Sequence, residues 1–174
     1  MDYTFAGLPL HVLLVHAVLV LTPLVTLALV LVAGWPAARR ILWIPAFTAA
    51  ALLLPLGLVT IEAGKWLEQR VPPAPLIQEH TAQGEDIVPW LYGIVVLAVV
   101  IAAWAVVELV AARRDAGAGA TARPGRAVRI VVGMVLTLAA LGVAAGTTWT
   151  LVQIGEAGSR AVWEGSFSDE PLER

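Results

Sequence analysis

The sequence predicts an all-α polytopic membrane protein: a bundle of four transmembrane helices, with a short extracytoplasmic helical segment between helices 2 and 3. Hydrophobic residues make up 59% of the 174 residues, mean hydropathy is +0.84, and charged residues are only 14%, against roughly 25% in soluble domains. Uncharged runs of about 20 residues can each cross a hydrocarbon core of roughly 30 Å. We therefore expect a single membrane domain over residues 1–163 and a flexible acidic tail over 164–174.

Each expected span has its own pattern. The first is interrupted only by two histidines and Pro23, and because no positive residue precedes it, it is expected to remain as an uncleaved helix. The second contains Pro45 and Pro55, which membrane helices tolerate, and the third is interrupted late by Glu108. The fourth is uncharged after its first residues. The expected spans cover residues 8–33, 41–61, 87–112 and 128–154.

Basic residues predict the orientation of the bundle. Seven lie in the turn after the first span and in the connection after the third, whereas four lie on the other side. Because cytoplasmic loops carry the excess of Lys and Arg, both termini and the segment 63–86 are expected outside the cytoplasm. The inner connection, residues 115–126, consists of small residues and is expected to be a flexible linker. No internal repeat is apparent.

The outer segment is expected to form two short helical pieces, KWLEQR and PLIQEHTAQGED, separated by the proline-rich residues 71–75. Proline in a first turn favours a helix start, so the second piece can continue into the third span. His80 then lies about 10 Å outside the membrane boundary at Ile87, at 1.5 Å per residue.

All three histidines fall at this outer end, and the chain has no cysteine. His11 and His16 are five residues apart, which separates them by about 140° around the helix, so they are not a chelating pair. They should face different neighbours. His16 lies deeper in the apolar layer, where an imidazole is costly unless it faces the bundle interior and finds a partner.

Imidazoles from different helices are the usual ligands of haem or a transition metal in a helical bundle. Haem ligation from both sides requires His80 together with either His11 or His16, and the sequence leaves both pairings open. His11, His16 and His80 are therefore the candidate ligands of haem b or of a transition metal ion. The plainer alternative is that each histidine is an interfacial residue or bonds a group on a neighbouring helix.

Other polar and small residues are expected to support this site, because they gather at the same end. A tight turn at the two glycines of the fourth helix could bring backbone amides and a serine over the outer mouth. The favoured alternative is a helix end followed by a turn anchored by Trp163. The supporting residues are Glu62, Glu85, Glu156, Gly155, Gly158 and Ser159.

Three blocks carry a resemblance to a known family: GLPLHVLLVHAVLVLTPL, EHTAQGED and IGEAGSRAVW. In this order, from about residue 8 to 163, they resemble the bacterial membrane-protein family catalogued as domain of unknown function 2231. The resemblance implies four transmembrane helices in a bacterial plasma membrane, but no established activity. This chain has Val12 where the family commonly has proline. The matching positions are His11, His16, His80, Gly84, Gly155, Gly158 and Trp163.

Several functions are disfavoured. Without cysteine, covalent haem attachment, thiolate clusters and disulfides are absent. No Walker A sequence, G-x-S-x-G elbow or H-E-x-x-H pair occurs, so no catalytic residue is assigned and an enzyme is not favoured. Few basic residues and a net charge of −2 argue against nucleic acid as a partner.

The leading hypothesis is an electron-transfer or sensing protein that binds haem b or a transition metal, with the lipid bilayer and a redox protein as partners. The alternative is a structural accessory subunit of a larger membrane complex, without a cofactor; a homo-oligomer is also compatible with the sequence. Small residues allow close helix contacts in that case. They lie in the fourth helix at Ala139, Ala140, Gly142, Ala144, Ala145 and Gly146. A transporter is weaker, since ionisable residues are nearly lacking at the midplane.

Overall fold

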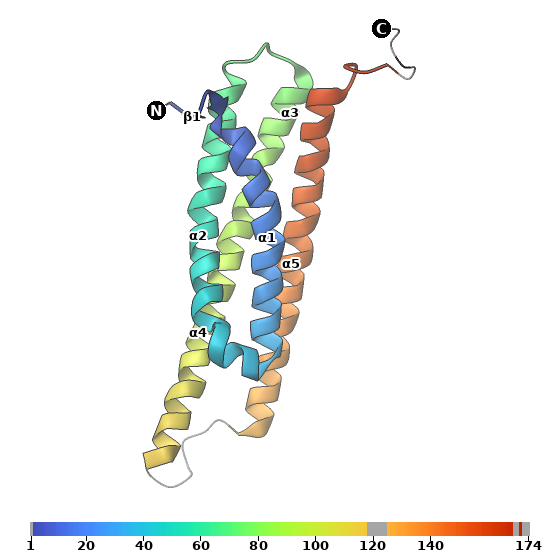
Figure 1. Ribbon diagram of the computed structural model, residues 1–174. Coiled ribbons are helices and arrows are strands. Elements are labelled where there is room, and N and C mark those ends of the chain that lie inside the picture. Colours follow the sequence, from blue (N-terminus) through green and yellow to red (C-terminus); the bar gives the residue numbers. More distant parts are fainter. Residues whose placement is uncertain (1, 118–124, 169–170, 172–174) are drawn as a thin grey trace.

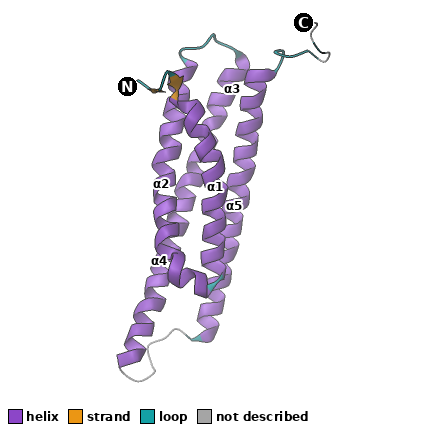
Figure 2. Cartoon of the chain, in the orientation of Figure 1, coloured by secondary structure: helices purple, strands orange, loops and turns teal. Residues whose placement is uncertain are grey.

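The computed structural model describes residues 2–117, 125–168 and 171, most of which are helical (Figure 2). The helices in chain order are α1 Leu10–Gly34, α2 Pro36–Glu68, α3 Pro75–Gln83, the 3₁₀ helix η1 Gly84–Ile87, α4 Val88–Gly117 and α5 Arg126–Trp163. A small antiparallel hairpin, β1 Thr4–Phe5 and β2 Leu8–Pro9, precedes α1. Its turn has positive φ at Ala6 and Gly7. This hairpin is the only strand structure among the described residues.

The helices form a bundle of four long rods (Figure 1). α3, η1 and α4 follow one another as a single rod, which packs against α2 and α5. α1 also packs against both α2 and α5, so the four rods form a closed ring. The N-terminal hairpin, the end of α5 and the α2–α3 connection lie at one end of the bundle, and the α1–α2 turn lies toward the other.

Four rods are long and apolar enough to cross a membrane, which confirms the expected number. They cover residues 10–34, 36–68, 75–113 and 126–163. Leu29, Val32 and Ile94 are buried between the helices. Leu27 and Leu138, in contrast, expose more than 60% of their surface. A bundle whose outer surface is also apolar is suited to lipid rather than water. By length and composition, these four helices suggest a multi-pass membrane protein.

One local prediction at the outer end is wrong. KWLEQR is not a separate helical piece, because α2 continues to Glu68; the second piece, α3, runs into η1 and α4 as expected. At the end of the fourth helix, α5 continues past Gly155 and Gly158 to Trp163 and a turn follows, in agreement with the favoured alternative and not with a tight turn at the two glycines. The physical reason is packing at two positions: Gly64 and Gly158 each lie against a histidine ring of a neighbouring helix, so these glycines allow close approach and not a change of direction.

The inner connection and the acidic tail fall partly outside the described residues. α4 extends through the first residues of the predicted linker to Gly117, and residues 118–124 are not described. In the tail, Gly165 has φ 75° in a turn that follows α5. The predicted flexibility of both segments stays a prediction.

A buried ion pair lies at the end of the bundle opposite the chain termini. The side chain of Arg39 in α2 is only 1% exposed. Its Nε lies 2.9 Å from Oε2 of Glu108 in α4. Its Nη1 also donates to the carbonyls of Val32 and Ala33, at 3.0 and 2.7 Å. These carbonyls belong to the last turn of α1, which has no further turn to bond them. One side chain therefore links three helices.

Candidate histidine site

His11 joins the first turn of α1 to the end of α2. Its Nδ1 lies 2.9 Å from the carbonyl oxygen of Thr60. The half-buried ring also rests on Gly64, where a Cβ atom would lie 2.9 Å from Nδ1 and 3.0 Å from Cε1. Any side chain at position 64 would collide with the ring, so glycine is required for this close approach.

His80 makes the corresponding contact between α3 and α5. Its Nδ1 lies 3.2 Å from the carbonyl oxygen of Ile154. Its ring rests on Gly158, where a Cβ atom would lie 2.9 Å from Cε1 and 3.2 Å from Nδ1. The imidazole thus occupies the space that a side chain on α5 would otherwise take.

The two contacts are built in the same way. Each histidine bonds a helix carbonyl and rests on the glycine four residues, about one turn, further along the same helix. In both helices the glycine ends the tripeptide Glu-Ala-Gly, at 62–64 and at 156–158. This short repeat is not among the features predicted from the sequence. It marks two similar units, α1 with α2 and the α3–α4 rod with α5, each placing a histidine from its first helix on the end of its second.

The repeated contacts bring the two imidazoles together at the centre of the outer end. The ring centroids of His11 and His80 are 6.3 Å apart and their planes are inclined at 74°. Since a carbonyl oxygen can only accept a hydrogen bond, each Nδ1 must be the donor. In the neutral imidazole, Nε2 then carries the lone pair. Neither Nε2 receives a hydrogen bond from the part of the chain that the structure describes.

His16 does not belong to this pair. Its side chain is exposed on α1, and its Nδ1 lies 2.6 Å from the carbonyl oxygen of Val12 on the same helix. The polar partner of His16 is therefore the Val12 carbonyl of its own helix, and His16 does not face the bundle interior. The structure thus selects His11 as the neighbour of His80.

The predicted acidic residues form ion pairs at the rim. Lys65 lies 3.1 Å from Glu62 and 2.8 Å from Glu85, which ties α2 to η1. Glu156 pairs with Arg160 one turn further along α5, at 2.6 Å. These groups are largely exposed, and none of the ion pairs involves a histidine. Ser159 is exposed on α5 and does not fold over the mouth, because the tight turn that this would require is absent.

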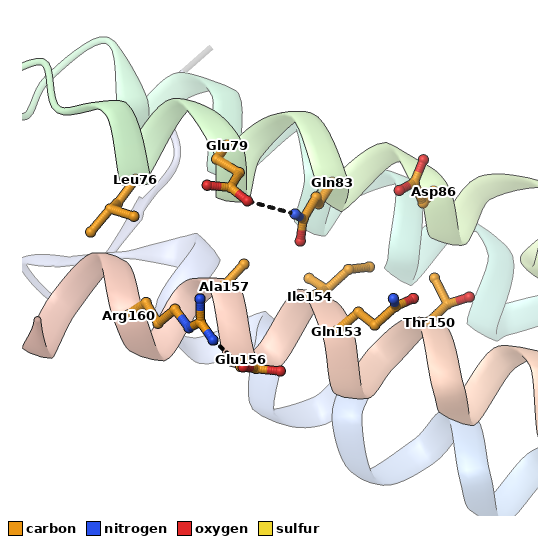
Figure 3. A pocket seen from close by; sticks show the side chains of 10 residues that line it. All are labelled: Leu76, Glu79, Gln83, Asp86, Thr150, Gln153, Ile154, Glu156, Ala157 and Arg160. Carbon is orange, nitrogen blue, oxygen red and sulfur yellow. Dashed lines mark hydrogen bonds and ion pairs between the residues drawn. The ribbon is translucent and has the colours of Figure 1, made fainter.

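A cavity of about 330 Å³ lies between α3 with η1 and α5 (Figure 3). Glu79, Gln83 and Asp86 face it from one side, and Gln153 and Arg160 from the other. Ile154, whose carbonyl bonds His80, also lines it. None of the three histidines lines this cavity, so it lies beside the histidine pair and not between the two rings.

Comparison with known proteins adds no assignment: no family profile, no curated protein and no solved structure matches this chain. The resemblance carried by the three sequence blocks therefore stays a prediction. Within residues 2–117 and 125–168, no group of three or more His, Cys, Asp and Glu residues is arranged to hold a metal ion. The two histidines are the feature on which a functional proposal can rest.

Replacing Gly158 by alanine is expected to displace the His80 ring, because the new Cβ would lie 2.9 Å from its Cε1. The Nδ1 hydrogen bond to Ile154 should weaken, and the imidazole ¹⁵N resonances of His80 should shift while those of His16 do not. Gly155→Ala is the matched control, since no atom lies within 4 Å of its Cβ position. Unchanged His80 resonances in Gly158→Ala would contradict the packing described here.

Proposed function

We propose that this protein binds haem b through His11 and His80 and serves in electron transfer or in sensing. The observation that carries the proposal is the pair of imidazoles held 6.3 Å apart by two different helical units. Two imidazoles that share one metal ion, each bound through its free ring nitrogen at about 2.0–2.1 Å, have ring centres roughly 6 Å apart. The separation of the two rings is therefore compatible with His11 and His80 holding one metal centre.

The number of ligands favours haem over a bare metal ion. A structural zinc site needs four protein ligands, and the described residues offer no group of three or more suitable side chains. Haem would need only His11 and His80 from the chain, because its macrocycle supplies the other ligands of the iron. A transition metal ion held by the two histidines and solvent is the other version of this proposal.

The backbone contacts supply what a haem ligand requires from its surroundings. A ligating histidine generally donates its second ring N–H to a carbonyl or carboxylate, which sets the ring orientation and raises ligand basicity. His11 and His80 both have such a partner, in Thr60 and Ile154. Bound haem would supply one-electron chemistry. His11 and His80 would hold the haem, each through its Nε2.

The proposed location follows from the position of the site. In the orientation predicted by the basic residues, the histidine pair lies near the extracytoplasmic surface of a bacterial plasma membrane, with both chain termini on that side. A site at this depth could exchange electrons with a soluble partner outside the cytoplasm. The rim of exposed ion pairs around Lys65 and Arg160 would be the surface that such a partner meets.

The test is an absorption spectrum of the protein purified in mild detergent, oxidised and then reduced with dithionite, with metal analysis of the same sample. A Soret band with sharp α and β bands on reduction is the expected result. A colourless, metal-free protein, even after haem is supplied during expression, would contradict the proposal. Copper or zinc at one equivalent without haem would favour the metal-ion version.

The alternative function is that of an accessory subunit without a cofactor. One observation favours it: α5 buries only 11% of its most apolar window, against 28–39% for the other three rods. Leu138 and Trp149 on this helix are more than 60% exposed. Native mass spectrometry after gentle extraction would identify a constant partner in that case, whereas a free monomer would count against it.

A further inference from the structure

A second cavity, of about 280 Å³, lies at the other end of the bundle between α2, α4 and α5. Three arginines line it, Arg39, Arg40 and Arg129, together with a single carboxylate, Glu108. Trp43 and apolar residues of α4 complete the wall. The cavity is therefore basic on one part of its wall and apolar on the other.

The basic charge of this cavity is not fully neutralised by the chain. Arg39 and Glu108 form an ion pair at 2.9 Å, and Arg39 also bonds two carbonyls of α1. These two charges cancel. Arg40 and Arg129 are exposed and form no ion pair with any residue in the described ranges. Two guanidinium groups from different helices thus remain available to an anion.

The helix ends add to this positive potential. α2 begins at Pro36 and α5 at Arg126, so both helix N-termini lie near the cavity, within about one turn of the arginines that line it. Neither N-terminus has a side-chain cap. The N-terminal end of a helix dipole favours negative charge. Two helix ends and two unpaired arginines therefore act in the same direction.

We propose that this cavity binds the phosphate group of an anionic phospholipid. Planar guanidinium groups bond phosphate oxygens in pairs, which suits Arg40 and Arg129. Basic pockets between transmembrane helices on the cytoplasmic side are typical sites for lipid head groups. Trp43 and Leu109 supply the apolar and interfacial contacts that an acyl chain and glycerol backbone would meet. This proposal does not depend on the histidine pair.

The test compares three forms of the full-length protein: wild type, Arg40→Gln/Arg129→Gln and Arg126→Gln. Arg126 is one turn before Arg129 on α5 but does not line the cavity, so its replacement controls for general loss of positive charge. Phosphatidylglycerol is titrated into each detergent-solubilised form and bound lipid is counted by native mass spectrometry. Inorganic phosphate is titrated in parallel by calorimetry. Thermal unfolding verifies that the variants fold.

Saturable binding of phosphatidylglycerol to wild type, weakened about tenfold in the double variant and less than about twofold in Arg126→Gln, is the expected result. Binding of inorganic phosphate with the same dependence on Arg40 and Arg129, without a preference for the lipid, would support the phosphate site and assign it to a free anion. Equal lipid binding by wild type and the double variant, with no phosphate binding, would overturn the proposal.

Discussion

His11→Ala and His80→Ala are each expected to lower the haem content of the purified protein by about tenfold or more, and the double variant is expected to bind none. In the proposed site, each substitution would remove one of the two protein ligands of the haem and leave the other imidazole alone. A single variant that retains some haem should therefore change from a six-coordinate to a five-coordinate spectrum. Haem per protein is measured by the pyridine haemochrome assay, together with the reduced absorption spectrum.

His16→Ala is the matched control for this experiment. It removes an imidazole from the same helix as His11, but His16 is exposed and bonds only the carbonyl of Val12. Its spectrum and haem content should equal those of wild type. Haem loss in His16→Ala but not in His80→Ala would show that the ligands are a different pair, and a spectrum unaffected by all three substitutions would exclude histidine ligation.

Arg39→Met is expected to destabilise the bundle by about 3–5 kcal/mol, the usual cost of removing one partner of a buried ion pair. Glu108, whose side chain is 16% exposed in the structure, would lose its partner, and the last carbonyls of α1 would lose their hydrogen-bond donor. The free energy of unfolding is measured by denaturant titration in detergent. Arg40→Met, at the neighbouring exposed position, should cost less than about 1 kcal/mol.

A second variant separates charge from packing at this site. In Arg39→Met/Glu108→Leu both charges are absent, so the penalty of an unpaired buried carboxylate disappears. Part of the stability lost in Arg39→Met should therefore return, while the α1 carbonyls remain unbonded. If the double variant is less stable than Arg39→Met, the ion pair is not the main contribution of Arg39.

Features of the site that depend on neighbouring residues in the sequence could be predicted, whereas those that depend on contacts between distant residues could not. Hydrophobicity, proline and charge act locally, so the four spans and the clustering of histidines at one end could be predicted from the composition of each segment. The contacts of Gly64 and Gly158 with the histidine rings could not be predicted in this way, because a glycine in the sequence is equally compatible with a turn. The repeated Glu-Ala-Gly tripeptide was the one local signal of this packing.

Four apolar helical rods, with three histidines near one end, could be predicted from the sequence alone. The contact of His11 with His80, the outward position of His16, and the orientation of the two rings by Thr60 and Ile154 depend on tertiary packing. The reason is that the apolar runs specify which residues cross the membrane, whereas the rotation of each helix depends on side chains packing across the bundle. Those contacts join residues 49 and 74 positions apart in the chain.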